Sequence, residues 1–256
     1  IKFQHHLPDE EMLPDVYKSK NFKSSLYNFL KKYSLKIKDH YELKKYCKKN
    51  KIQYLCTPFS AKAALELNEI GVSCFKIGSG EFSDLPFIES VCKLKKPVIL
   101  STGMSDLREI IEVSKFLKKF KNQFAIMNCT SEYPPIYEDI NIGFIEVLKK
   151  KLPNFVIGHS DHTNTIYTSL AAVARGAKII EKHVYLDGKN FGPDRDVSIS
   201  FKQFREMVDA IRKIEIALGD KKRIYKKEME IVKWAKRSLV TTKELRAGQL
   251  IKVGDI

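Results

Sequence analysis

Two ionisable residues lie two positions apart in a segment that otherwise has the composition of a β-strand. The segment is "IIEKHVYLD", and it contains Glu181 and His183 on either side of Lys182. Side chains at positions i and i+2 of a strand point the same way, so Glu181 and His183 share one face and Lys182 takes the other. Burying ionisable groups in an apolar core costs free energy. The segment is therefore either a strand end in solvent or part of a polar site, and its surroundings decide between the two.

Polar residues also follow the earlier segments of strand-like composition. In chain order they are Lys2, then Thr57, then Lys76, Ser79 and Glu81, then Ser101, then Ser131 and Tyr133, and then Ser160 and His162. One such residue alone is weak evidence, because hydroxyl side chains also cap helices. The carboxyl ends of parallel strands meet at one edge of a sheet, where barrel enzymes carry their chemistry. The recurrence at successive strand ends therefore predicts a functional site.

Two subsets of these residues suggest different chemistry. The first combines two ammonium groups with hydroxyls, which suits a phosphate and a carboxylate; its members are Lys2, Lys76, Thr57, Ser79, Ser101 and Ser160. The second is the pair His162 and His183, at the ends of adjacent strands about 5 Å apart. Their imidazoles could converge on one divalent metal, with Glu181 or Asp194 nearby.

Alternating strand-like and helix-like segments predict an α/β fold with a parallel sheet. Strands are expected near residues 1–4, 53–57, 74–77, 97–101, 124–128, 155–160 and 178–183, and helices near 41–50, 61–70, 86–93, 106–119, 142–151, 165–175 and 201–218. Seven strands are one fewer than a TIM (β/α)8 barrel contains, so we expect such a barrel without its first βα unit. No G-x-G-x-x-G follows the first strand, which disfavours a dinucleotide-binding fold.

The chain is expected to continue beyond the barrel into a second region. Residues 1–225 are assigned to the truncated barrel, 226–236 to a linker, and 237–256 to the start of a small domain of β type. The last segment, "RSLVTTKELRAGQLIKVGDI", is rich in β-branched residues between turn signals. We expect the remainder of that domain to lie outside this chain.

Composition excludes several classes of protein. The 256 residues carry a formal net charge of +15 without a nucleic-acid-binding motif, so we expect solvated lysine-rich helices and no nucleic-acid partner. The positive field would favour an anionic small substrate. No apolar run approaches a membrane span, and no signal peptide is visible. The five cysteines are widely spaced and form no C-x-x-C, which favours a reducing cytoplasm over a disulfide framework.

Six motifs in this order resemble the sialic acid synthase family, which includes N-acetylneuraminate, legionaminate and pseudaminate synthases. They are "FKIGSGEF", "ILSTGM", "NCTSEYPP", "SDHT", "EKHVYLD" and "GPDRDVS". The resemblance covers nearly the whole chain. It implies a TIM barrel followed by a small antifreeze-like (SAF) domain that caps the partner's barrel in a domain-swapped homodimer. It also implies a transferase that condenses phosphoenolpyruvate with an N-acylated hexosamine to a nine-carbon 2-keto acid and phosphate, with manganese or magnesium.

The resemblance also implies roles for individual residues. His162 and His183 match the metal ligands, and Glu81, Tyr133, Glu181 and Asp194 match positions that hold the sugar or transfer protons. The residues that match the phosphoenolpyruvate site are Lys2, Thr57, Lys76, Ser79, Ser101, Ser131 and Ser160. Ser131 departs from the family pattern, because many relatives have asparagine there. A sugar-binding glutamate of the first strand and an arginine of the small domain have no counterpart, so we expect this chain alone to be inactive.

Two other interpretations remain open from the residues themselves. A Schiff-base aldolase would use Lys76 or Lys2 as its nucleophile and would need no metal. A non-catalytic, sugar-binding barrel would keep the fold without the reaction. For the segment that opened this section, we expect Glu181 to face the barrel interior beside His183. Lys182 should turn toward the outer helices and reach water with its long stem. We also expect "DGKNFGPDR" to fold over the site and return Asp194 toward the metal.

Overall fold

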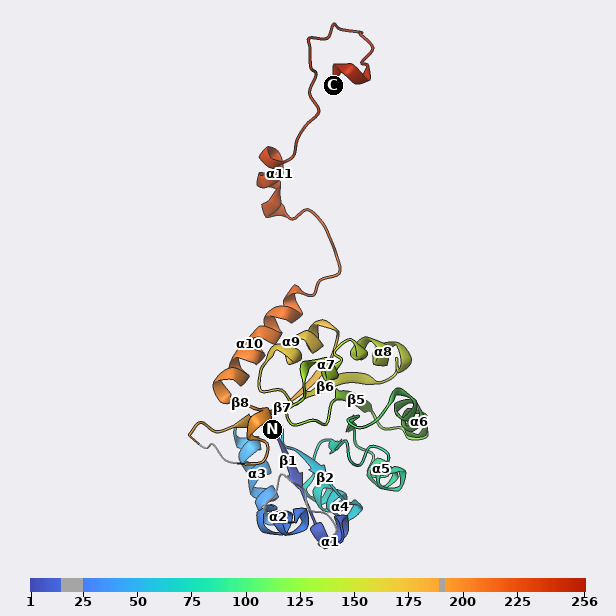
Figure 1. Ribbon diagram of the computed structural model, residues 1–256, viewed down its shortest axis with the longest axis vertical. Helices are drawn as coiled ribbons and strands as arrows, with labels where there is room; N and C mark the ends of the chain where they lie inside the picture. Colours follow the sequence, from blue (N-terminus) through green and yellow to red (C-terminus); the bar gives the residue numbers. More distant parts are fainter. Residues whose placement is uncertain (15–24, 189–191) are drawn as a thin grey trace. The chain divides into compact units, whose positions relative to one another are not determined.

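The computed structural model describes residues 1–14, 25–188 and 192–256. Its internal contacts divide the chain into two units, Ile1–Ala217 and Leu218–Ile256. The first unit contains the sheet and the predicted site residues (Figure 1). Each unit is described by itself below.

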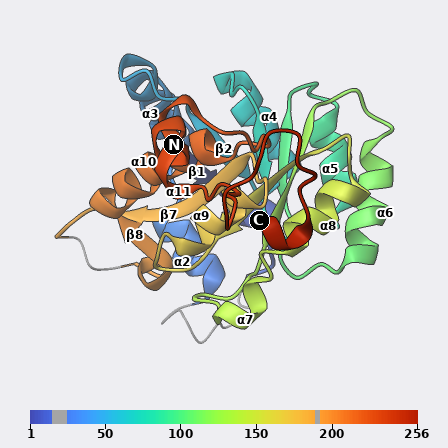
Figure 2. The same cartoon turned by 90° about the horizontal axis from the view of Figure 1, so that it is seen from above.

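The first unit is built on strands that pair in chain order. The strands are β1 (Lys2–His5), β2 (Leu55–Pro58), β3 (Phe75–Ile77), β4 (Val98–Ser101), β5 (Phe124–Cys129), β6 (Val156–Asp161), β7 (Ile179–Tyr185) and β8 (Ser198–Ser200). Within the described residues they form one parallel sheet in the order β1 to β8, which curls into a half-barrel (Figure 2). The register pairs Gln4 with Thr57, Cys129 with Ser160, and Ser160 with Glu181. Residues paired in this way face the same side of the sheet.

Helices of the first unit connect the strands. They are α1 (Pro8–Glu11), α2 (Leu26–Tyr33), α3 (Ile37–Lys49), α4 (Ala61–Ile70), α5 (Leu85–Cys92), α6 (Leu107–Leu117), α7 (Tyr137–Ile140), α8 (Phe144–Lys151), α9 (Tyr167–Ala174) and α10 (Phe201–Ala217), with the 3-10 turn η1 (Arg195–Val197). Several begin at a capping side chain: Ser60, Asp84 and Asp106 each accept a hydrogen bond from a first-turn amide. Gly71, at a φ of +79°, ends α4 in the left-handed region.

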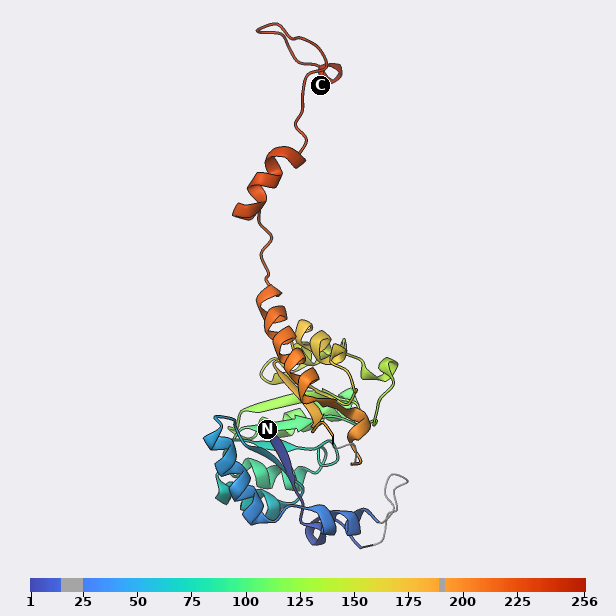
Figure 3. The same ribbon diagram turned by 90° about the vertical axis from the view of Figure 1, so that its left-hand side faces the viewer.

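Helices lie around the outside of the sheet (Figure 3), and the hydrophobic core fills the space between them and its outer face. Phe75, Ile77 and Leu100 of the strands are fully buried there, against helix residues such as Leu67 and Ile88. Helix α4 packs on β2, α8 and α9 pack on β6, and α10 packs on β7 and β8. The core therefore occupies the outer layer, which leaves the concave face free to carry polar groups.

The expected α/β architecture with parallel strands is confirmed, and all seven expected strands are present. The expectation of seven was one too few, because β8 was missed: three residues are too short to show a period-2 pattern. β8 lies at the opposite edge of the sheet from β1, so the expected loss of a first βα unit stays a prediction. The short helices α1, α2 and α7 were also missed.

The second unit contains little regular structure. Its elements are η2 (Lys226–Glu228), α11 (Met229–Ala235) and η3 (Val253–Asp255). Residues 237–256, for which the sequence predicts a β-type pattern, form no strand. A strand needs a hydrogen-bonded neighbour, and the local pattern supplies none here. In the described parts of the chain, every helix is too short or too polar to cross a membrane.

Candidate active site

Glu181 of β7 lies at the centre of a charged cluster on the concave face of the sheet. Its Oε1 is 3.1 Å from Nζ of Lys2 on β1 and 3.8 Å from Nζ of Lys76 on β3. Neither strand is a neighbour of β7 in the sheet, so these contacts cross the interior of the half-barrel. Ser160, its register partner on β6, donates a hydrogen bond to the same Oε1 at 3.1 Å. The prediction that Glu181 faces the interior is confirmed.

Lys76 connects this cluster to the strands on the other side of the interior. Its Nζ donates to Oγ of Ser101 on β4 at 2.6 Å and to the carbonyl of Ile77 at 2.9 Å. Thr57 of β2 is also buried, and its Oγ1 has no hydrogen-bond partner among the described residues. We use the name anion pocket for Lys2, Thr57, Lys76, Ser101, Ser160 and Glu181. The sequence-predicted phosphate and carboxylate ligands on these strands are therefore brought together.

The charges in the anion pocket shift each other's titration. Burial alone would raise the pKa of Glu181, but the ammonium groups of Lys76 and Lys2 and the hydrogen bonds from Lys2 and Ser160 lower it to about 2. Burial, opposed by Glu181 and assisted by Lys2, lowers the pKa of Lys76 to about 8. At neutral pH the pocket therefore holds two ammonium groups against one carboxylate. That excess of positive charge favours an anion with more than one negative charge.

Ser79 and Ser131 meet at a glycine beside the pocket. Oγ of Ser79 accepts a hydrogen bond from the amide of Gly103 at 3.0 Å. A β-carbon placed on Gly103 would lie 2.0 Å from Oγ of Ser131 and 2.8 Å from Oγ of Ser79. Glycine is therefore required at position 103, because any side chain there would collide with the two hydroxyls. Sequence reasoning missed it, although the "STGM" motif contains it.

The predicted metal ligands lie side by side at the carboxyl ends of β6 and β7. The ring centroids of His162 and His183 are 5.4 Å apart, and the planes are tilted by 54°. Tyr133 stacks on His162 with centroids 4.3 Å apart, and its hydroxyl lies 3.2 Å from Nε2 of that ring. Asp194 follows β7, and its Oδ2 is 3.7 Å from Nδ1 of His183. We use the name histidine rim for Tyr133, His162, His183 and Asp194.

The histidine rim fits a metal held by two protein imidazoles. Nδ1 of His162 lies 2.8 Å from the carbonyl of Thr130, which can only accept, so Nδ1 carries the proton and Nε2 keeps its lone pair. Carbonyl partners of this kind commonly orient histidine ligands. Burial lowers the pKa of both His162 and His183, which favours the neutral form that binds metals. Within residues 1–14, 25–188 and 192–256, three or more acidic, histidine or cysteine side chains never converge on one metal position, so water or substrate would complete the coordination.

Glu81 lies close to Gly78, near the carboxyl end of β3. Its Oε2 would be 2.6 Å from a β-carbon on Gly78, and in the part of the chain that the structure describes this oxygen is buried without a hydrogen-bond partner. Burial raises the pKa of Glu81, and the nearby carboxylate of Glu11 adds to the effect. A carboxyl group with a raised pKa and a free oxygen suits proton transfer.

The expectation for Lys182 was half correct. Its side chain turns away from Glu181 and His183, as predicted, but it does not reach water: its exposed fraction is 0%. Its Nζ instead lies 3.0 Å from Oδ1 of Asp161 on β6. The reason is that helices cover this part of the outer face, α9 on β6 and α10 on β7, so the long stem has no path to solvent. Residues 189–191 of the expected covering turn lie outside the described residues.

One further pair near the carboxyl end of β1 was not foreseen. Nδ1 of His6 is 2.8 Å from Oε2 of Glu11, and the His6 ring stacks on Phe59 with centroids 3.9 Å apart. The two residues are five positions apart across a turn, which matches neither strand nor helix periodicity. The sequence signal was therefore limited to the position of His6 after a strand.

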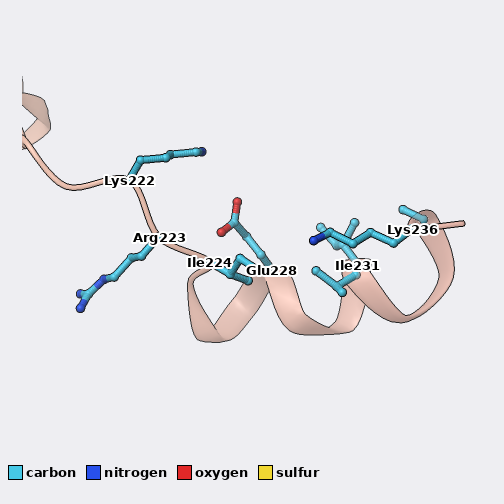
Figure 4. Close-up of a pocket in the computed structure, with 8 residues that line it drawn as sticks. Lys222, Arg223, Ile224, Glu228, Ile231 and Lys236 are labelled. Carbon is cyan, nitrogen blue, oxygen red and sulfur yellow. The ribbon is translucent and has the colours of Figure 1, made fainter. Parts of the chain in front are cut away.

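The second unit has a hollow of its own beside α11 (Figure 4). Its lining residues are Lys222, Arg223, Ile224, Glu228, Ile231, Val232, Ala235 and Lys236. None of the sequence-predicted site residues lines it. Glu228 caps the turn before α11 by accepting a hydrogen bond from the amide of Tyr225 at 2.7 Å. Its carboxylate therefore has a structural role.

Comparisons with known proteins agree on one family. A sequence profile of the NeuB family matches residues 1–223. An N,N'-diacetyllegionaminic acid synthase of Campylobacter jejuni is 38% identical over 89% of this chain and 69% of its own length. The human N-acetylneuraminate-9-phosphate synthase is 32% identical over 82% of this chain and 59% of its own length.

Solved structures give the same result for the fold. An N-acetylneuraminic acid synthetase of Leptospira borgpetersenii, solved in complex with citrate, superposes with a TM-score of 0.81 at 31% identity. The match covers 91% of this chain and 79% of that protein. A truncated 3-deoxy-D-arabino-heptulosonate 7-phosphate synthase of Thermotoga maritima superposes with a TM-score of 0.65 at 17% identity. This second match shows a similar fold and nothing more.

Proposed function

The chain belongs to the NeuB family, and from that premise we propose that it condenses phosphoenolpyruvate with an N-acylated hexosamine of the N-acetylmannosamine type. The products are a nonulosonic (sialic-type) acid and phosphate. The observation that carries the proposal is the anion pocket: two ammonium groups and buried hydroxyls surround Glu181. Beside it lie the two imidazoles of the histidine rim, with their centroids 5.4 Å apart. The names of the synthase relatives support the same reaction.

The anion pocket would hold phosphoenolpyruvate through its phosphate and carboxylate. Lys2 and Lys76 would each contribute a charge-assisted hydrogen bond, with hydroxyls from Ser101 and Ser160 completing the contacts. Ser79 and Ser131 would extend this set at Gly103, and the unpartnered Oγ1 of Thr57 would gain a partner. Glu181 would hold the two ammonium groups in place before the ligand arrives. A pocket organised in this way avoids an ordering cost on binding.

The histidine rim would hold Mn2+ or Mg2+ through His162 and His183. Such an ion, when bound, polarises the sugar's open-chain aldehyde as a Lewis acid. Tyr133 would lie against the sugar with its exposed ring face, since half of its surface is accessible. Asp194 would face the same substrate from the segment after β7.

Among the predicted carboxylates, Glu81 is the best suited to accept a proton during the reaction. As C3 of phosphoenolpyruvate bonds to the aldehyde carbon, the aldehyde oxygen gains a proton. Water then adds to C2 and gives one proton to an active-site base, which replaces the proton taken up by the aldehyde oxygen. The C2–O bond breaks as the remaining hydroxyl proton passes to the departing phosphate, which leaves the ketone at C2. Glu181, with a pKa of about 2, is a poor acceptor, whereas Glu81 has a raised pKa and a free buried oxygen. We assign the proton from water to Glu81 and an electrostatic role to Glu181.

A second candidate function rests on one observation. The pKa of Lys76 is lowered by burial to about 8, and a lysine of this kind can form a Schiff base with a carbonyl substrate. A Schiff-base aldolase would need neither phosphoenolpyruvate nor a metal. Its covalent adduct would be trapped by borohydride, whereas the proposed condensation forms no such adduct.

The experiment is an assay of the complete protein, including the further βα unit and the SAF domain proposed below, with phosphoenolpyruvate, Mn2+ and a panel of N-acylated hexosamines. Phosphate release and the mass of the organic product are measured together, with Lys76→Met as the matched control. We expect equal amounts of phosphate and of a nine-carbon 2-keto acid with at least one sugar. Borohydride-trapped protein, or no sugar-dependent phosphate with any member of the panel, would overturn the proposal.

The proposal extends to the assembly that the sequence resemblance implies. It includes a barrel closed by a further βα unit before β1, with the three-residue β8 additional to the eight barrel strands. It also includes a SAF domain that begins in residues 237–256, a domain-swapped homodimer and a cytoplasmic location. The support for these features is the family membership of the chain. Sedimentation of the full-length protein and of a variant truncated at residue 236 would test the dimer and the role of that domain together.

A further inference from the structure

A buried ion pair joins the outer faces of β6 and β7, directly behind the candidate site. Nζ of Lys182 lies 3.0 Å from Oδ1 of Asp161, and the exposed fractions of the two side chains are 0% and 1%. The residues are register partners on neighbouring strands. The pair therefore connects the two strands that carry the histidine rim, on the face opposite the site.

Neighbouring groups satisfy both charges. Asp161 accepts from Oγ1 of Thr168 at 2.7 Å and from Oγ of Ser169 at 2.6 Å, both on α9. It also accepts from the amide of Thr163 at 2.9 Å, and Lys182 donates to the carbonyl and hydroxyl of the same threonine. The pair thus ties β6, β7 and α9 to one another with directional bonds.

Each charged residue stands between two site residues that face the other way. Asp161 separates Ser160 from His162, and Lys182 separates Glu181 from His183. Because a strand alternates its faces, the position of each outward residue determines the position of its two inward neighbours. A shift between β6 and β7 would therefore change the Ser160–Glu181 contact and the separation of the two imidazoles together.

We propose that Asp161 and Lys182 are positioning residues that hold His162 and His183 at the separation one metal ion requires. The proposal rests on the proposed function. A buried ion pair is a weak source of stability, because the cost of removing two charges from water offsets most of their attraction. Apolar residues would hold α9 on the sheet equally well. The ion pair and its hydrogen bonds are directional, so they fit only one register and one spacing of β6 and β7.

The test uses the full chain with Lys182→Met and, separately, Asp161→Asn. Lys182→Met removes the charge at similar volume, and Asp161→Asn keeps acceptors for Thr168 and Ser169 if the first variant fails to fold. Tyr54→Phe is the matched control, because it removes the buried hydrogen bond of 2.6 Å to His40 in another part of the core. Two quantities are measured at a temperature where each variant is folded: Mn2+ affinity by electron paramagnetic resonance, and ring 15N chemical shifts of the metal-free histidines.

We expect both pair variants to weaken Mn2+ binding by about 10–100-fold, the range for residues that orient metal ligands. Without metal, the ring signals of His162 and His183 should move in both variants and stay in place in Tyr54→Phe. Unchanged ring signals in a folded pair variant would overturn the proposal, whatever its stability. If the parent chain does not bind Mn2+, the metal role in the proposed function fails, while the ring signals still decide the positioning role.

Discussion

The anion pocket and the histidine rim occupy the same edge of the sheet, but they are built in different ways. In the anion pocket Lys76, Ser101 and Ser160 are buried, and Lys76 and Ser160 both contact Glu181. At the histidine rim Tyr133 is 50% exposed, and the contact between His183 and Asp194 is 3.7 Å, too long for a hydrogen bond. Most polar groups of the anion pocket bind one another before a ligand arrives, with Oγ1 of Thr57 left over among the described residues. The histidine rim is more open, and a metal would have to displace the Tyr133 hydroxyl from Nε2 of His162.

This difference matches what each half is proposed to bind. A small anion is recognised by charge, and charges fixed in advance bind it without a further ordering cost. A metal needs free lone pairs and room for water or substrate, so its ligands cannot satisfy one another. The comparison implies that the two halves respond differently to mutation and to pH.

The largest effect is expected at the histidine rim. In His183→Ala we expect Mn2+ binding to be lost, since one of two imidazole anchors is gone. The rate of condensation should fall by about 10³-fold, because Lewis-acid stabilisation is worth several kcal/mol. Metal content and turnover are the measurements, with circular dichroism as the check on folding. Full activity in metal-stripped protein carrying both His162→Ala and His183→Ala would contradict the assigned role.

Removal of an ammonium group from the anion pocket is expected to have the next largest effect. Lys76→Ala should weaken phosphoenolpyruvate binding by about 1.5–3 kcal/mol, the range for a hydrogen bond to a charged group. Affinity for Mn2+ should stay within about threefold of the parent, a change smaller in free energy than the loss of one hydrogen bond to a charged group. Calorimetric titration with each ligand separates the two. If only sugar affinity changed, the assignment of the two halves would be reversed.

The pH dependence of phosphoenolpyruvate binding should also distinguish the two halves. The pKa of Lys76 is about 8 in the free chain, so the pocket loses positive charge as the pH rises through that value. Affinity should therefore be level just below this pH and fall by up to about tenfold per pH unit above it. Lys76→Met should remove the fall. A fall that persists in this variant would assign the titration to another group.

Tyr133→Phe is expected to have the smallest effect. It removes the hydroxyl that lies 3.2 Å from Nε2 of His162 but keeps the ring that stacks on the imidazole. We expect a change of about 2–10-fold in kcat/KM for the sugar, the worth of one neutral hydrogen bond. Phosphoenolpyruvate affinity should not change. A larger loss of phosphoenolpyruvate affinity than of sugar affinity would show that the anion pocket and the histidine rim do not bind separate ligands, and would contradict the division of the site.

Strand periodicity was sufficient to predict most of the site and the sheet that carries it. The placement of Glu181 inside the half-barrel followed from its i, i+2 relation to His183, because alternation of faces is a property of any strand. The partner of Lys182 could not be predicted in this way, since it depends on how α9 covers the outer face. Strand β8 was missed because Ser198–Ser200 is too short to show a pattern. The His6–Glu11 pair depends on a turn geometry that periodicity does not describe.

The most direct test of the central claim follows one oxygen atom through the reaction. The complete protein is supplied with an N-acylated hexosamine, Mn2+ and phosphoenolpyruvate that carries oxygen-18 between C2 and phosphorus, and the released phosphate is examined by mass spectrometry. Water added at C2 and cleavage of the C2–O bond would leave the label in phosphate, and this is the predicted result. Unlabelled phosphate, with the heavy oxygen retained in the organic product, would mean cleavage of the P–O bond and would contradict the account.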